Sequence, residues 1–282
     1  MHERYLEQVR LLIAVLAHIA KEDVFALKGG TAINLFYRDM PRLSVDIDLA
    51  YVPIEDRETS LARIDAALDR ITASIERLGP GYRARRTAGG GSHDTRIIVS
   101  DGRARVKVET SPVARGTSAA PVTMPVADSV IEQFGFVETP VLAFEDLYGG
   151  KLHAALDRQH PRDLFDIKGL YEHEGLNDPL FRAFMVYVAC SQRPMHELLA
   201  PPPSDLDALY DSEFAGMTRE PIGKEELRAV EEKLHADIRS RLTGDIADFL
   251  LCLHDAAPDF GRIGLPQAAH LPAVRWKLRN LE

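Results

Sequence analysis

The chain has 282 residues, 45% hydrophobic and 27% charged, so it is long and apolar enough to bury a core in each of two domains, which excludes a disordered protein. Its net charge of -9 excludes a protein that coats nucleic acid through bulk charge, so any nucleic-acid partner must meet a local basic patch. The charged start MHERYLEQVR, and the lack of the roughly 18 consecutive apolar residues that a membrane helix requires, predict a cytoplasmic protein without a membrane partner.

The first half of the chain mixes helical and strand patterns. Apolar residues spaced three and four apart predict a helix from Tyr5 to Ile19, and a short strand from Val24 to Leu27 runs into a Gly-Gly turn. Acidic and β-favoured residues alternate from Val45 to Tyr51, which is typical of a strand with one buried face. The remaining predicted elements are a helix at 32–37, a helix at 56–78, and strands at 95–99 and 104–109. Together they predict a small mixed sheet with helices.

The second half contains helical patterns. The predicted helices span 143–156, 162–173, 179–190, 224–241 and 246–254. The sequence therefore predicts an α+β protein in which a small mixed β-sheet core with helices, residues 1–140, precedes a mainly helical domain, residues 141–282.

Two acidic residues on the strand after the Gly-Gly turn are candidate metal ligands. Side chains two apart on a strand emerge on the same face, so Asp46 and Asp48 present neighbouring carboxylates, while Ile47 and Leu49 face inward. Hard oxygen ligands of this kind select Mg²⁺, which proteins usually hold through one or two carboxylates and substrate phosphates. Glu109, on a strand that can pair beside the first, is the candidate third ligand. Such a site could support nucleotidyl transfer from a nucleoside triphosphate (NTP).

The Gly-Gly turn is a candidate phosphate site. At Gly29 and Gly30 the missing Cβ atoms would let a triphosphate approach backbone N–H groups at the start of a helix. Thr31 can add a hydroxyl donor, and Ser44 precedes the acidic pair by two positions. Neither a Gly-Gly nor an Asp-x-Asp is specific alone, but their fixed order within about twenty residues favours a nucleotide-binding site.

These residues resemble a known family. Lys28-Gly29-Gly30-Thr31 with Ser44-Val45-Asp46-Ile47-Asp48 is similar to the first motif of the AbiEii/AbiGii (MenT-like) nucleotidyltransferase toxins, which belong to the DNA polymerase β-like superfamily. The segments 151–158 and 161–166 are similar to the second and third motifs of that family. The resemblance implies that Asp46 and Asp48 bind Mg²⁺, that Lys151 contacts the nucleotide phosphates, and that Asp163 or Asp166 is a further acid needed for activity.

The spacing of the second motif permits two interpretations. Lys151 and Arg158 lie on one helical face, where a pair of cations could face a nucleotide, or where the face could be solvated with Asp157 as a partner. Asp163 and Asp166 stand in the first turns of the next helix, a position that acids also favour because of the positive helix end.

A basic segment is the candidate RNA contact. Residues 83–107 carry seven basic side chains against two acidic ones, so Arg83, Arg85, Arg86 and Arg96 could meet a phosphate backbone, although a solvated hairpin would look similar. A smaller basic tail, Arg275, Lys277 and Arg279, has no assigned purpose.

The sequence thus predicts a Mg²⁺-dependent enzyme that transfers a nucleoside monophosphate from an NTP to RNA. The family resemblance implies the 3′ end of tRNA as acceptor, a block of translation, and a cognate antitoxin protein as partner. Two alternatives stay open: an enzyme that nucleotidylates a protein, and a catalytically inactive nucleotide- or RNA-binding module.

Overall fold

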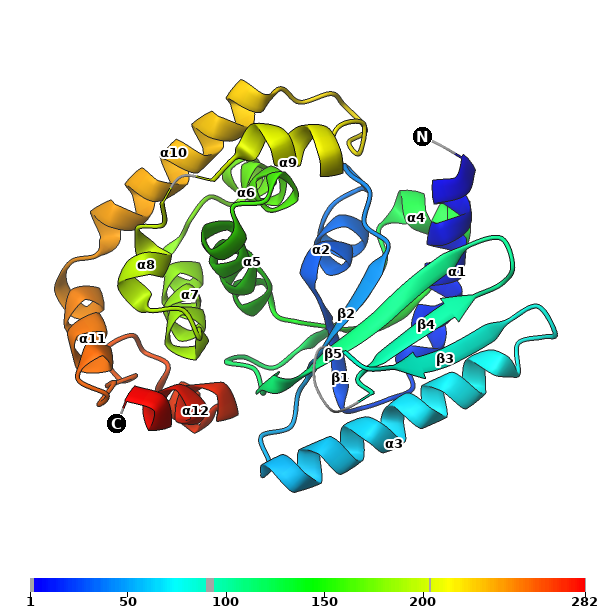
Figure 1. The fold of residues 1–282 in the computed structure, drawn as a ribbon, viewed down its shortest axis with the longest axis horizontal. Coiled ribbons are helices and arrows are strands. Elements are labelled where there is room, and N and C mark those ends of the chain that lie inside the picture. Colours follow the sequence, from blue (N-terminus) through cyan, green and yellow to red (C-terminus); the bar gives the residue numbers. More distant parts are fainter. Residues whose placement is uncertain (1–2, 90–93, 203, 282) are drawn as a thin grey trace. The chain divides into compact units, whose positions relative to one another are not determined.

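The computed structural model describes residues 3–89, 94–202 and 204–281, and it divides into two compact units, residues 1–143 and 144–282 (Figure 1). The first unit holds a mixed sheet with helices and the second is helical, so the predicted α+β class is confirmed. Within the described residues no helix is both long and apolar enough to cross a membrane.

The first unit is built on a seven-stranded sheet with the order β3-β4-β5-β2-β1-β7-β6. The β2 strand pairs antiparallel with β1 and parallel with β5, and β1 pairs parallel with β7, which makes the sheet mixed. The strands are β1 (Phe25–Lys28), β2 (Asp46–Tyr51), β3 (Arg83–Thr87), β4 (Arg96–Ser100), β5 (Arg105–Arg115), β6 (Val122–Pro125) and β7 (Glu138–Val141).

One face of this sheet is apolar and covered by helices. Ile47, Leu49, Ile97, Val99 and Val108 are fully buried on it. The long α3 runs beside β3, and α1 packs against both α3 and β5, so both helices cover this face (Figure 1). The helical elements of the unit are α1 (Glu3–Ile19), α2 (Gly29–Ala32), the π-helical η1 (Ile33–Tyr37), α3 (Arg57–Glu76) and α4 (Asp128–Phe134). The opposite face is left for polar residues of β2, β4 and β5.

Some elements of this unit differ from the sequence expectation. The predicted helix at 32–37 is π-helical from Ile33 to Tyr37, and β5 continues to Arg115 rather than ending at 109. The strands β3, β6 and β7 and the helix α4 were not predicted. Their patterns are weak: β3 has only Ala84 buried, and the four-residue β6 and β7 each contain a proline, which is depleted in strands.

The second unit contains a bundle of helices. Their bounds are α5 (Phe144–Arg158), α6 (Pro161–His173), α7 (Asp178–Cys190), α8 (Met195–Leu199), α9 (Leu206–Glu213), α10 (Lys224–Arg241), α11 (Gly244–His254), the 3₁₀ turn η2 (Pro266–His270) and α12 (Pro272–Leu281). A core cluster unites α6, α9 and α10 through Leu164, Leu206, Phe214, Ile222 and Leu227. This cluster fixes the helix α6, which carries two of the candidate site residues.

The basic tail of the sequence is part of α12. The Lys277 Nζ atom donates hydrogen bonds to the carbonyl oxygens of Val188, Ser191 and Arg193, at 3.4, 2.8 and 3.3 Å. These carbonyls lie at and just beyond the C-terminal end of α7, where backbone acceptors lack partners within the helix and cations are favourable. Lys277 therefore caps α7.

Candidate active site

The two acidic residues of β2 stand on the polar face of the sheet. Ile47 and Leu49 are fully buried, as the alternation predicted, while Asp48 is partly buried and the Asp46 side chain is 50% exposed. Because strand side chains alternate between faces, the two carboxylates emerge on the same side, two positions apart.

The strand β5 places a cation and a third acid beside this pair. In the parallel register of β2 and β5, Lys107 lies opposite Asp46 and Glu109 lies opposite Asp48. The Lys107 Nζ atom is 3.0 Å from Glu109 Oε2 and 3.8 Å from Asp46 Oδ2. The predicted pairing of the Glu109 strand beside the acidic strand is therefore present.

Glu109 is already engaged by cations. Arg96 Nη2 on β4 is 2.7 Å from Glu109 Oε1, in addition to the Lys107 contact. Burial raises the pKa of Glu109, but hydrogen bonds from Arg96 and Lys107 outweigh burial and lower it below its ordinary value. Across residues 3–89, 94–202 and 204–281, no three His, Cys, Asp or Glu side chains are grouped as they would be around a metal ion.

The Gly-Gly turn passes directly against the acidic strand. Gly29 has φ +76°, and a Cβ atom there would lie 2.8 Å from Asp48 Oδ2. At Gly30 a Cβ atom would lie 2.5 Å from Arg42 Nη2 and 2.9 Å from Ser44 Oγ. Both glycines are therefore required for the close approach of this backbone to the carboxylate and the hydroxyl.

Two hydroxyl groups fasten the turn to the start of β2. The buried Thr31 hydroxyl donates to the backbone carbonyl of Asp46, and its Oγ1 is 3.1 Å from Ser44 Oγ. The Ser44 backbone N–H donates to Tyr5 Oη at 3.2 Å. Thr31 thus positions the acidic strand, while Ser44 lies beside Gly30.

The Asp48 carboxylate is partly buried and its pKa is raised above the ordinary value. Burial raises its pKa, and the positive charges of Lys28 and Lys107 only partly oppose this effect. Within the described residues it makes no hydrogen bond or ion pair of its own. Two carboxylates on one face, one of them without a partner and next to a side-chain-free turn, fit the Mg²⁺ preference for one or two protein carboxylates plus substrate phosphates.

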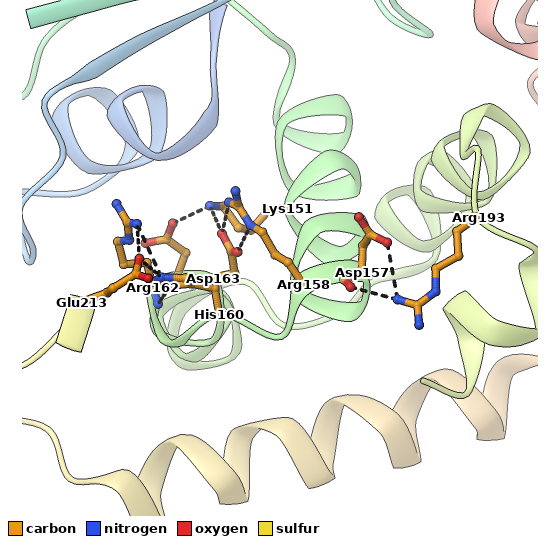
Figure 2. Close-up of polar contacts among 9 residues, drawn as sticks. Lys151, Asp157, Arg158, His160, Arg162, Asp163, Arg193 and Glu213 are labelled. Atoms are coloured by element: carbon orange, nitrogen blue, oxygen red, sulfur yellow. Dashed lines mark hydrogen bonds and ion pairs between the residues drawn. The ribbon is translucent and has the colours of Figure 1, made fainter. Parts of the chain in front are cut away.

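A second polar cluster lies in the helical unit (Figure 2). The Lys151 side chain on α5, 5% exposed, is 2.8 Å from Asp163 Oδ1 and 2.9 Å from Asp166 Oδ2 on α6. Arg158, also on α5, holds Asp163 through Nε at 2.6 Å and Nη2 at 2.9 Å. The structure thus brings together all four of the predicted residues of this unit.

Burial in this cluster is strongly uneven. The Asp163 side chain is fully buried, whereas the Arg158 side chain is 61% exposed. Burial alone would raise the pKa of Asp163, but the charge of Lys151 and the hydrogen bonds from Arg158 hold it well below its ordinary value. A buried ion pair of this kind needs every partner, because a charge left alone in the interior is costly.

A histidine next to this cluster was not predicted from the sequence. His160 caps α6: its Nδ1 accepts the Arg162 backbone N–H at 3.1 Å, so Nε2 is the nitrogen that donates to Glu213 Oε2, also at 3.1 Å (Figure 2). Burial lowers the pKa of His160, which favours this neutral form. The His-Pro dipeptide ahead of a helical pattern was the available signal, because proline favours the first helical position.

The predicted RNA-binding arginines divide between the two faces of the sheet. The register places Arg83, Arg85 and Arg96 on the same face as Asp46 and Asp48. Arg83 and Arg85 are exposed, and Arg83 donates to the carbonyls of residues 80 and 82.

Arg86 faces the other way. It contacts α3, where its guanidinium is 2.6 Å from both Asp65 Oδ1 and Asp69 Oδ1. These two ion pairs tie β3 to α3, so Arg86 has a structural partner on the helix-covered face.

Comparisons with known proteins identify the family of the chain and a solved structure of similar fold. The family model described as "Nucleotidyl transferase AbiEii toxin, Type IV TA system" matches residues 10–280. Among solved structures, MenT4, a nucleotidyltransferase toxin from Mycobacterium tuberculosis H37Rv, is similar in fold, with a TM-score of 0.65 at 16% identity over 100% of this chain and 95% of that one. The comparison with curated proteins gave no match.

Proposed function

The chain belongs to the AbiEii family of nucleotidyltransferase toxins, and on that premise we propose that it transfers a nucleoside monophosphate from an NTP to the 3′ end of tRNA. A tRNA extended in this way cannot be aminoacylated, so translation stops. The observation that carries the proposal is the acid pair Asp46 and Asp48, which shares one sheet face and lies against the Gly29 backbone.

In this proposal the acid pair holds Mg²⁺. Mg²⁺ bound there would neutralise the negative charge that develops on the phosphates during transfer. The backbone N–H groups at Gly29 and Gly30 are proposed to bind the triphosphate, and Ser44, whose hydroxyl lies against Gly30, is proposed to add a donor there. Thr31 holds the start of β2 in position through the Asp46 carbonyl.

The cations of the helical unit are proposed to bind nucleotide phosphates. Arg158 is the accessible donor, since its side chain is 61% exposed even while it holds Asp163. Lys151, Asp163 and Asp166 form the buried support that orients it, and Lys151 retains one N–H beyond its two carboxylate contacts.

The RNA acceptor is proposed to meet the basic side of the polar sheet face. Arg83 and Arg85 are exposed on β3, and Arg96 lies between them and the acid pair in the sheet order. Phosphates bound along these strands would bring a polynucleotide end toward Asp46 and Asp48.

Catalysis is tested with the purified full chain, Mg²⁺, each labelled NTP in turn, and total tRNA. Asp48→Asn, which keeps the side-chain shape, is expected to lower transfer by about a hundredfold to a thousandfold, the range for loss of one essential electrostatic group. Asp23→Asn, an exposed acid that precedes β1, is the matched control and should retain activity.

The outcome separates the alternatives. Label in RNA supports the proposal, label in polypeptide indicates protein nucleotidylation, and NTP binding without transfer indicates an inactive binding module. Equal labelling by wild type and Asp48→Asn would overturn the assignment of the site. Sequencing of tRNA 3′ ends after brief expression of the chain in cells would identify the added base and the acceptor.

A further inference from the structure

The polar sheet face carries a cation that none of the proposed steps uses. We propose that the Lys107 ammonium is a built-in counterion of the acid site, which a divalent cation must displace in order to bind. The inference rests on the proposed metal-dependent transfer and adds a positioning residue to it.

The strand register places Lys107 between acids of two neighbouring strands. Arg105, Lys107 and Glu109 share one face of β5, and Lys107 lies opposite Asp46 in the pairing with β2. The Lys107 Nζ atom contacts acids on both strands, Glu109 at 3.0 Å and Asp46 at 3.8 Å. The ammonium is therefore bound where carboxylates from two strands meet.

The local charge balance supports the same inference. Asp46, Asp48 and Glu109 gather three negative charges on adjacent strands, and Arg96 compensates Glu109 from the far side. Among the residues described, Lys107 is the cation that lies within 4 Å of acids on both strands. Without it, neighbouring carboxylates would repel one another on the sheet face.

The Lys107 ammonium and a metal ion cannot both bind the same carboxylate oxygens. An ammonium and a dication that share a carboxylate repel each other strongly at a few ångströms, because the local dielectric is lower than that of water. The Lys107 side chain is 33% exposed and has a flexible four-carbon stem, so it can swing away. Glu109 keeps its bond to Arg96 when Lys107 leaves.

The experiment measures Mn²⁺ binding by titration calorimetry on the full chain without nucleotide. Lys107→Met removes the competing charge and keeps an unbranched stem, so it should bind Mn²⁺ about tenfold more tightly than wild type. Lys107→Arg retains the charge and should bind like wild type. Arg105→Gln, two residues earlier on the same face of the same strand, is the matched charge-removal control and should leave the affinity unchanged.

A second readout, thermal melting, is independent of catalysis. In EDTA, Lys107→Met should melt at a lower temperature than wild type, and saturating Mn²⁺ should raise its melting temperature by more. Circular dichroism before the titration verifies that each variant is folded.

Equal or weaker Mn²⁺ binding by Lys107→Met would overturn the counterion inference while leaving the metal site intact. If neither wild type nor Lys107→Met binds Mn²⁺, even with a non-hydrolysable triphosphate present, the metal-dependent function falls together with the inference.

Discussion

Replacement of Asp163 by asparagine should destabilise the helical unit far more than replacement of Arg158, its exposed partner in the cluster around Lys151. Asp163 is fully buried and receives hydrogen bonds from both Lys151 and Arg158. The amide keeps the shape but removes the charge, which leaves the buried Lys151 ammonium with Asp166 as its one carboxylate. Removing one partner of a buried ion pair costs roughly 3–5 kcal/mol of unfolding free energy. Because Asp166 still pairs with Lys151, we expect a loss at the lower end of this range, about 3 kcal/mol.

The chain offers a specific probe for this measurement. Its one tryptophan, Trp276, is on α12, so urea unfolding followed by tryptophan fluorescence reports on the helical unit. With an m-value of about 2 kcal/mol/M, a loss of about 3 kcal/mol lowers the midpoint by about 1.5 M. Far-UV circular dichroism on the same samples reports on both units together.

The control is Arg158→Gln. It breaks contacts with the same carboxylate, but its side chain is 61% exposed, so the loss should stay within about 1 kcal/mol. An Arg158→Gln midpoint shift as large as that of Asp163→Asn would refute the claim that burial decides the cost.

The pH dependence supplies a further check. The pKa of Asp163 is lower in the folded chain than its ordinary 3.8, so its stabilisation is complete above that value and is lost as the pH falls below it. Wild type and Asp163→Asn should therefore differ most at neutral pH and converge in acid. A difference that grows on acidification would contradict this assignment.

Three further changes test the sheet unit. Gly29→Ala forces a Cβ into a positive-φ position and against the Asp48 carboxylate, so it should abolish transfer while costing about 1–2 kcal/mol in urea unfolding. Asp48→Asn should raise the melting temperature in EDTA, because burial raises the pKa of Asp48 and its ionised form therefore destabilises the fold at neutral pH. This difference from wild type should become smaller as the pH falls toward the pKa of Asp48, where wild type becomes protonated. Arg85→Glu should raise KM for tRNA several-fold and reduce the salt dependence of binding by a slope of about 1, whereas Arg77→Glu, exposed at the end of α3, should change neither. An unchanged KM in Arg85→Glu would remove β3 from the proposed RNA path.

Local pattern was sufficient for the elements with strong periodicity. The acidic strand, the first helix and the helices α5, α6, α7 and α10 each bury a regular stripe that the sequence displays directly. The β3 strand could not be found in this way, because four of its five residues are polar and its stability comes from pairing with β4 and from the Arg86 contacts with α3. Such tertiary pairing overrides local propensity.

The same limit applies to the site. The shared face of Asp46 and Asp48 follows from the period of a strand, and their closeness to the Gly-Gly turn follows from the short connection. The position of Lys107 opposite Asp46 depends on the register between strands about sixty residues apart, which no local pattern specifies. Likewise, the Thr31 hydroxyl was expected to face phosphate, and only the folded turn shows that it is bonded to the Asp46 carbonyl.

The helix cap made by Lys277 changes how the end of this sequence should be interpreted. A terminal run of basic residues suggests a tail that is free to search for polyanions, yet this lysine is anchored to three main-chain oxygens some eighty residues upstream. Trimming the chain before α12 would expose those oxygens and loosen the last turn of α7. A shortened chain that lacks α12 should therefore have a less stable helical unit.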